Sequence, residues 1–220
     1  KLSDVDLVVL STPMSEYEKI IPNLNRYLNK NCLITDVGST KENILKLKNK
    51  KLSKSLDWIT SHPISGSEVS GPEYGTKNLF VKKWCIVVSD KNKLKQNKLL
   101  KFWKKLGSNV IIMDAKIHDK IFSITSHLPH FIAFSLVKSL SNLDSDKIYS
   151  GGGLKDFTRI AASDVKMWKD IFSHNKEEIL KAIDDFIESV NFFRTQIKQD
   201  DLDKIEKFIE EAKAFKEHKL

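Results

Sequence analysis

The sequence has little of several residue types, and each shortage excludes a class of protein. It contains two cysteines, Cys32 and Cys85, and both lie within apolar runs. We expect two buried thiols, which support neither a disulfide framework nor a cysteine metal site. No apolar run approaches the roughly 20 residues that a membrane span needs, and no signal peptide is visible. A cytoplasmic location is therefore expected.

Arginine is scarce although the chain is basic, with a formal net charge of +8. The positive charge is nearly all lysine and is scattered along the chain. It does not form the basic stripe, interleaved with aromatic residues, that is typical of nucleic-acid binding. A lysine-rich solvated surface explains the charge better. The arginines are Arg26, Arg159 and Arg194, and each is a candidate for gripping a carboxylate, which suits a planar guanidinium.

The sequence also lacks Gly-x-Gly-x-x-Gly, the fingerprint of a Rossmann-type dinucleotide-binding fold. Strands and helices nevertheless alternate up to residue 113, which predicts a parallel sheet with helices on its faces. Either the fold is a different one, or the first strands of such a domain are not in this sequence. Apolar runs predict strands at 5–10, 32–37, 58–61, 84–88 and 110–113.

Helix ends can be predicted between these strands. Ser15 is expected to cap the first helix, and Ser39 or Thr40 the second. A helix at about 93–106 should end at Gly107, which suits a C-cap.

From about residue 114 the pattern becomes helical to the end of the chain. The apolar stretch 115–143 contains Pro129, which should kink or break its helix. Apolar stripes predict further helices at 176–197 and 202–215. We therefore predict an α/β domain, residues 1–113, and an all-helical domain, residues 114–220, whose apolar faces also pair with a second copy.

One stretch, residues 61–75, combines a histidine with glycines and small residues. The preceding strand is expected to stop at His62, because Pro63 disfavours a helical start there. An imidazole at the carboxyl end of a strand, beside a glycine-rich loop that holds Glu68, is where open α/β sheets place ligand chemistry. A surface loop with an incidental histidine is the alternative, and this stretch alone favours neither.

Three further sets of polar residues lie where the backbone is expected to be irregular. Ser39 could simply cap a helix, the histidines could be core or surface residues, and Arg159 could pair with Asp156. Because neither His-Glu-x-x-His nor a cysteine pair occurs, no metal site is expected, and a serine nucleophile elbow is absent as well. The three sets are residues 36–41 after the second strand, Ser126, His127 and His130 around Pro129, and Arg159 after the glycine run 151–153.

Four ordered motifs together resemble the prephenate/arogenate (cyclohexadienyl) dehydrogenase family of tyrosine biosynthesis. The resemblance covers nearly the whole chain, including the order of sheet and helices. It also accounts for the missing glycine fingerprint, since the family's N-terminal strand and glycine loop would precede Lys1. The motifs are residues 36–41, residues 62–71, residues 126–130, and residues 151–161 with Trp168.

The resemblance implies NAD- or NADP-dependent oxidative decarboxylation of prephenate to 4-hydroxyphenylpyruvate, or of arogenate to tyrosine. It assigns His62 as the base on the ring hydroxyl and Ser39 as the serine beside that hydroxyl and the nicotinamide. The cofactor contacts that it implies are Thr12, Pro13 and Ser39. The substrate contacts that it implies are Arg159, His130, Gly152, Trp168, Glu68 and Asp156.

The family's helical domain forms a dimer, so the resemblance also implies a homodimer, without nucleic-acid or membrane partners. A non-catalytic dimerisation or regulatory module derived from such an enzyme is the alternative, but every catalytic-type residue is present. The residues leave open prephenate or arogenate, NAD or NADP, and feedback inhibition by tyrosine.

Overall fold

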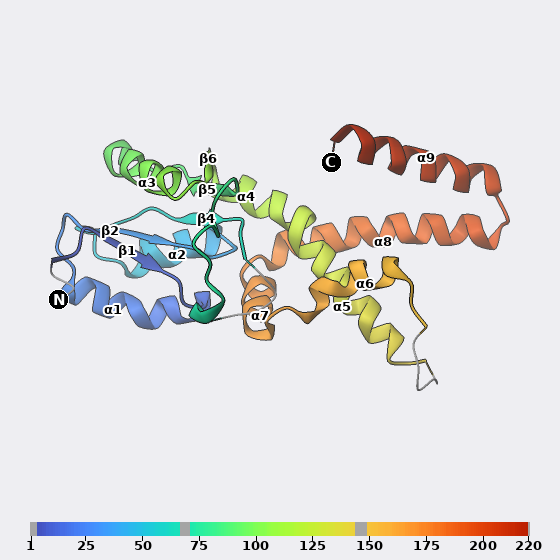
Figure 1. Ribbon diagram of the computed structural model, residues 1–220, viewed down its shortest axis with the longest axis horizontal. Helices are drawn as coiled ribbons and strands as arrows, with labels where there is room; N and C mark the ends of the chain where they lie inside the picture. Colours follow the sequence, from blue (N-terminus) through green and yellow to red (C-terminus); the bar gives the residue numbers. More distant parts are fainter. Residues whose placement is uncertain (1–3, 67–70, 144–148, 220) are drawn as a thin grey trace. The chain divides into compact units, whose positions relative to one another are not determined.

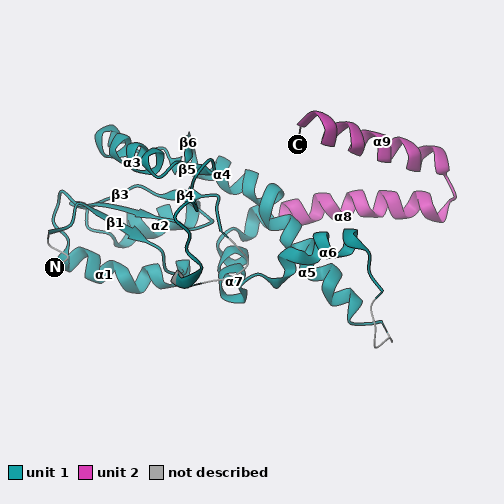
Figure 2. Ribbon diagram, viewed as in Figure 1, with its two compact units in different colours: residues 1–179 teal, residues 180–220 magenta. Residues whose placement is uncertain are grey.

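The structure, a computed structural model, describes residues 4–66, 71–143 and 149–219 (Figure 1). The chain divides into two compact units, residues 1–179 and 180–220 (Figure 2). The first unit contains the described strands and several helices, whereas the second is helical. The domain boundary predicted near residue 114 stays a prediction.

The described strands form two three-stranded sheets, and the strands predicted at 5–10, 32–37, 84–88 and 110–113 are present. They are β1 (Leu7–Leu10), β2 (Leu33–Asp36), β3 (Asp57–Trp58), β4 (Ser61–Pro63), β5 (Trp84–Val88) and β6 (Asn109–Met113). The order in the first sheet is β1-β2-β3, all parallel. In the second sheet, β4-β5-β6, the strands β5 and β6 are parallel but β4 runs antiparallel to β5.

The strand predicted at 58–61 is wrong, although β4 does end at Pro63, as expected. Residues 58–61 do not form one strand, because β3 ends at Trp58 and β4 begins at Ser61 in the other sheet. His62 lies within β4, opposite Ile86 of β5. Pro63 is tolerated because β4 is at the end of its sheet, where a missing backbone donor costs little.

Three helices, α1 (Tyr17–Tyr27), α2 (Glu42–Lys51) and α3 (Lys93–Lys105), accompany the strands (Figure 1). Tyr17 of α1 packs edge-on against Trp58, with ring centroids 5.5 Å apart. The side chains of α3 complete a core in which Cys85 is fully buried, and both cysteines are buried free thiols, as predicted. That core comprises Leu33, Ile59, Cys85, Val87, Leu99 and Trp103.

One predicted helix end is right and one is wrong. Gly107 follows α3 with a φ of 92°, the left-handed conformation that suits a glycine C-cap. Ser15, by contrast, lies in the short turn η2 (Met14–Glu16) before α1, and its side chain caps nothing. Its amide instead donates to Asp170 Oδ2 at 2.9 Å.

After β6 the first unit is helical, and the predicted break at Pro129 is confirmed. A π-helical turn, η4 (Ser123–His127), separates α4 (Ala115–Phe122) from α5 (Leu128–Leu140) immediately before this proline. Next come α6 (Gly152–Thr158) and η5 (Arg159–Ala162), which pack against α5. The remaining elements of this unit are α7 (Val165–His174) and the turn η3 (Pro72–Tyr74).

The helices predicted near the end of the chain are α8 (Lys176–Lys198) and α9 (Leu202–Lys219). Phe208 of α9 packs against Phe192 and Phe193 of α8, with ring centroids 5.8 and 5.1 Å apart. Across the described part of the chain, the helices are too short or too polar to cross a membrane.

Candidate active site

Two strand ends meet where the candidate site is built. Ser61 Oγ, in β4, donates to the carbonyl oxygen of Asp36 at 2.8 Å and lies 2.9 Å from Thr35 Oγ1. Ser39 follows β2 closely and His62 follows Ser61. These bonds therefore bring the two segments that carry the predicted catalytic residues next to each other. The carboxyl edge of β1 and β2 is the place where open α/β sheets bind ligands.

A buried ion pair fixes the loop after β2. Lys41 Nζ lies 2.6 Å from Asp36 Oδ2 and donates to the Ser61 carbonyl oxygen at 2.6 Å, and neither charged side chain is exposed. The Gly38 amide also donates to Asp36 at 3.0 Å. Burial lowers the pKa of Lys41, while the Asp36 carboxylate opposes this shift. Because losing one partner of such a pair is costly, the loop that presents Ser39 has one arrangement.

His62 is held by a second histidine. Its Nδ1 lies 2.9 Å from Nε2 of His118 on α4, and the Phe122 ring packs against both imidazoles. Burial lowers the pKa of His62 well below 6.5, and electrostatic interactions with His118, Lys41 and His127 act in the same direction. The imidazole of His62 is therefore uncharged at neutral pH and able to accept a proton.

Asp119 joins this histidine pair to helix α2. Its Oδ1 lies 2.8 Å from His118 Nδ1, and its carboxylate accepts the amides of Lys41 and Glu42 at 2.8 and 2.9 Å. The predicted cap from residues 39–40 is therefore wrong, because the cap of α2 is a side chain from α4. Neither His118 nor Asp119 was identified from the sequence, although both are almost fully buried beside His62.

Two predicted substrate residues come together on α5 and α7. The rings of His130 and Trp168 stack with their centroids 3.9 Å apart, and Phe134 and Phe172 pack around them. His130 Nδ1 lies 2.8 Å from the Ser126 carbonyl oxygen, to which it donates. The buried indole N–H of Trp168 has no acceptor within the described residues.

A cavity of about 320 Å³ lies at the carboxyl ends of β1 and β2, against α7. All three predicted cofactor contacts line it, namely Thr12, Pro13 and Ser39. Helix α7 also carries Trp168, so it connects the cavity to the aromatic cluster. The other lining residues are Ser11, Met14, Val37, Gly38, Asp164, Lys166, Met167 and Asp170.

The other predicted substrate contacts form a separate group. Gly152 and Asp156 are exposed residues of α6, and Arg159 begins η5 with an exposed side chain. Since η5 packs against α5, Arg159 and His130 are on neighbouring segments. Glu68 lies outside the described residues. In the part of the chain that is described, no group of three or more His, Cys, Asp or Glu could hold a metal ion.

Two family models together match nearly the whole chain. Residues 1–112 match the nucleotide-binding domain of prephenate dehydrogenase, and residues 114–211 match its dimerization domain. The chain belongs to the prephenate dehydrogenase family. The family predicted from the four motifs is therefore confirmed, as are the α/β and helical fold and the class of enzyme, an oxidoreductase.

Individual members of the family are also similar to this chain in sequence and in structure. The cyclohexadienyl dehydrogenase of Zymomonas mobilis is 32% identical, over 96% of this chain and 74% of the relative. The prephenate dehydrogenase of Bacillus subtilis is 31% identical, over 96% of this chain and 58% of the relative. A crystal structure of Aquifex aeolicus prephenate dehydrogenase with hydroxyphenyl propionate and NAD+ is 36% identical. It has a TM-score of 0.88 and covers 96% of this chain and 75% of that one.

Proposed function

We propose that this protein catalyses the NAD- or NADP-dependent oxidative decarboxylation of prephenate or arogenate, yielding 4-hydroxyphenylpyruvate or tyrosine. The observation that carries the proposal is the imidazole of His62, which is half-buried, uncharged at neutral pH and held beside the loop of Ser39. The similarity to relatives that carry this activity supports the same reaction.

His62 serves as the base. Hydride leaves the carbon that bears the ring hydroxyl more easily when that hydroxyl loses its proton, and a neutral imidazole can take it. Ser39, on the adjacent loop, is suited to hydrogen-bond the same hydroxyl. Loss of carbon dioxide from the opposite ring carbon then makes the ring aromatic, which drives the reaction.

The 320 Å³ cavity fits the nicotinamide end of the cofactor. It opens at the carboxyl ends of β1 and β2 and is lined by both apolar and hydroxyl-bearing side chains. A Cβ on Gly38 would lie 2.9 Å from Met14 Sδ, so the loop needs glycine to pack this closely. Thr12, Pro13 and Ser39 would hold the nicotinamide, whose chemistry is to accept hydride.

The substrate carboxylates need hydrogen-bond donors, and two side chains are candidates. The buried indole N–H of Trp168 is one, next to the imidazole of His130. Arg159 is the other, because its planar guanidinium can bind a carboxylate through two parallel hydrogen bonds. Gly152, Glu68 and Asp156 complete the proposed set of substrate residues, as the resemblance implies. We retain the cytoplasm as the proposed location.

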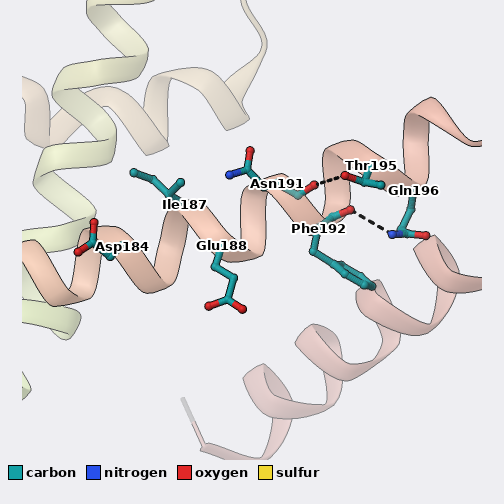
Figure 3. A pocket seen from close by; sticks show the side chains of 7 residues that line it. All are labelled: Asp184, Ile187, Glu188, Asn191, Phe192, Thr195 and Gln196. Carbon is teal, nitrogen blue, oxygen red and sulfur yellow. Dashed lines mark hydrogen bonds between the residues drawn. The ribbon is translucent and has the colours of Figure 1, made fainter.

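We also propose a homodimer that uses the helices of the second unit. A hollow of about 520 Å³ lies on α8, and Ile187 and Phe192, which line it, are 47% and 44% exposed (Figure 3). Such apolar side chains on one helix face suit burial against a second copy. The hollow is lined by Asp184, Ile187, Glu188, Asn191, Phe192, Thr195 and Gln196.

A steady-state assay of the full-length protein, with prephenate and arogenate against NAD and NADP, tests this proposal. We expect turnover with at least one pair, and a fall in kcat of about 10³-fold in His62→Asn, since a general base contributes about 10²- to 10⁴-fold. Arg26→Lys, on the exposed surface of α1, is the control. Unchanged turnover in His62→Asn, with an unchanged circular dichroism spectrum, would remove His62 from the mechanism.

A further inference from the structure

Three side chains form an ordered row of hydrogen bonds that ends at His62. Asp119 Oδ1 lies 2.8 Å from His118 Nδ1, and His118 Nε2 lies 2.9 Å from His62 Nδ1. Asp119 and His118 are 1% and 0% exposed, so water cannot replace either bond. Phe122 packs against both imidazole rings and restricts their planes.

The direction of each bond follows from the donors and acceptors present. The Asp119 carboxylate already accepts two backbone amides, from Lys41 and Glu42. The oxygen that accepts the Lys41 amide, Oδ1, is also the one that faces His118 Nδ1, so His118 Nδ1 carries a proton and donates it. His118 is buried and its pKa is lowered, so its other nitrogen, Nε2, is unprotonated and must accept from His62.

We propose that His118 is a positioning residue for His62, and that it fixes the tautomer with the proton on Nδ1 and the lone pair on Nε2. Asp119 fixes the orientation of His118 in turn. This inference rests on the proposed role of His62 as the base, and it names the nitrogen that acts. Nε2 of His62 takes up the hydroxyl proton, and Nδ1 keeps its own proton throughout.

The row also stabilises the imidazolium that forms when His62 takes up this proton. The Nδ1–H of His62 then donates to Nε2 of the neutral His118 imidazole. The Nδ1–H of His118 donates in turn to the Asp119 carboxylate. Without His118, nothing in this row selects the tautomer, and the form with the proton on Nε2 cannot act as a base toward the substrate. A purely structural role for His118 would leave the tautomer of His62 unaffected.

The tautomer can be measured without substrate or cofactor, by NMR of protein labelled with 15N-histidine. We expect both His62 and His118 to be neutral at pH 7 with the proton on Nδ1. In His118→Leu the proton of His62 should move to Nε2, the form that a free histidine side chain prefers. In His118→Gln it should stay on Nδ1, because the amide oxygen can still accept. A wild-type His62 with its proton on Nε2 would overturn the proposal.

Kinetics supply the second measurement. We expect His118→Leu to lower kcat about 100-fold with substrate KM changed less than about threefold, and His118→Gln to recover at least tenfold of that loss. His218→Gln, on the exposed end of α9, should change nothing. Equal losses in His118→Leu and His118→Gln would contradict the proposal. If neither prephenate nor arogenate is turned over while the tautomers are as expected, the proposed function is wrong and the positioning of His62 stands.

Discussion

The two units of the chain differ in the side chains that they bury. The first unit buries charged and titratable groups, among them Asp36, Lys41 and His118, each 0% exposed and each with hydrogen-bond partners. In the second unit the side chains buried among the described residues are Ala182 and Gln196. Large apolar side chains are exposed in both units, and those of the second include Ile187, Val190, Phe192, Ile197, Ile209 and Phe215.

This difference shows that the units gain their stability in different ways. The first unit has a core and can afford polar groups inside it, which is what a catalytic site requires. A pair of helices of roughly 40 residues has too little core of its own and usually needs a further contact to be stable. We therefore expect the second unit to pack against a partner surface.

The largest expected effect comes from substitutions on α8 that test whether the second unit pairs with a second copy. Replacing both Ile187 and Phe192 by Asp places charges at the proposed interface of each copy. We expect the dissociation constant of the dimer to rise about 10³-fold or more, because central apolar contacts each contribute at least about 2 kcal/mol. Analytical ultracentrifugation measures this constant.

A matched substitution in the first unit sharpens the result. Leu94 on α3 is 71% exposed, so Leu94→Asp introduces the same chemical change at an exposed apolar residue of that unit. Its dissociation constant should equal that of the unsubstituted protein. Equal weakening in both variants would mean that the two units do not differ in this respect.

The next effect concerns the buried polar groups of the first unit. Burial lowers the pKa of His127 to about 4, from 6.5 when exposed. Between these values the unfolded chain binds the proton more readily than the folded one. Protonation of His127 therefore does not reduce the free energy of unfolding above pH 6.5. As the pH falls from 6.5 towards 4, the free energy of unfolding decreases by about 3 kcal/mol.

Chemical denaturation at a series of pH values between 7 and 4 checks this expectation. His127→Gln should make the free energy of unfolding depend less steeply on pH, whatever its value at pH 7. The exposed His218→Gln should leave the slope unaltered. A slope that is the same in all three proteins would show that His127 is protonated equally in the folded and unfolded states.

The smallest expected effect concerns substrate binding, which should change independently of dimer formation and of the pH dependence of stability. Arg159→Lys replaces a planar fork by a point charge, so substrate KM should rise about tenfold while kcat changes less than about twofold. Association and the pH dependence of stability should be those of the unsubstituted protein. A variant that loses turnover but keeps its KM would assign Arg159 a different role.

Local sequence patterns predicted most helices and strands well, but they predicted less well which strands pair in a sheet. The run at residues 84–88 became β5 without a change of bounds, because a short apolar run between turns leaves few alternatives. The split between β3 and β4 was missed, since Pro63 suggested the end of a strand and not a place at the edge of a second sheet.

The site was predictable only where its residues form a motif. His62 and Ser39 lie in recognisable segments, and the structure brings those segments together. Asp119 contacts Lys41, 78 residues away, and no local pattern encodes such a contact. The available signal was weak: His118 and Phe122 are four residues apart on one helix face, next to a carboxylate that is ordinarily expected in solvent.

Asp119 has two duties at once, since it caps α2 and anchors the histidine pair. In the proposed mechanism, the hydrogen bonds that position His62 therefore form only when α4 packs against α2. On the same proposal, nothing orients the imidazole of residue 62 in a chain that has not completed its folding, so catalytic competence requires the finished fold.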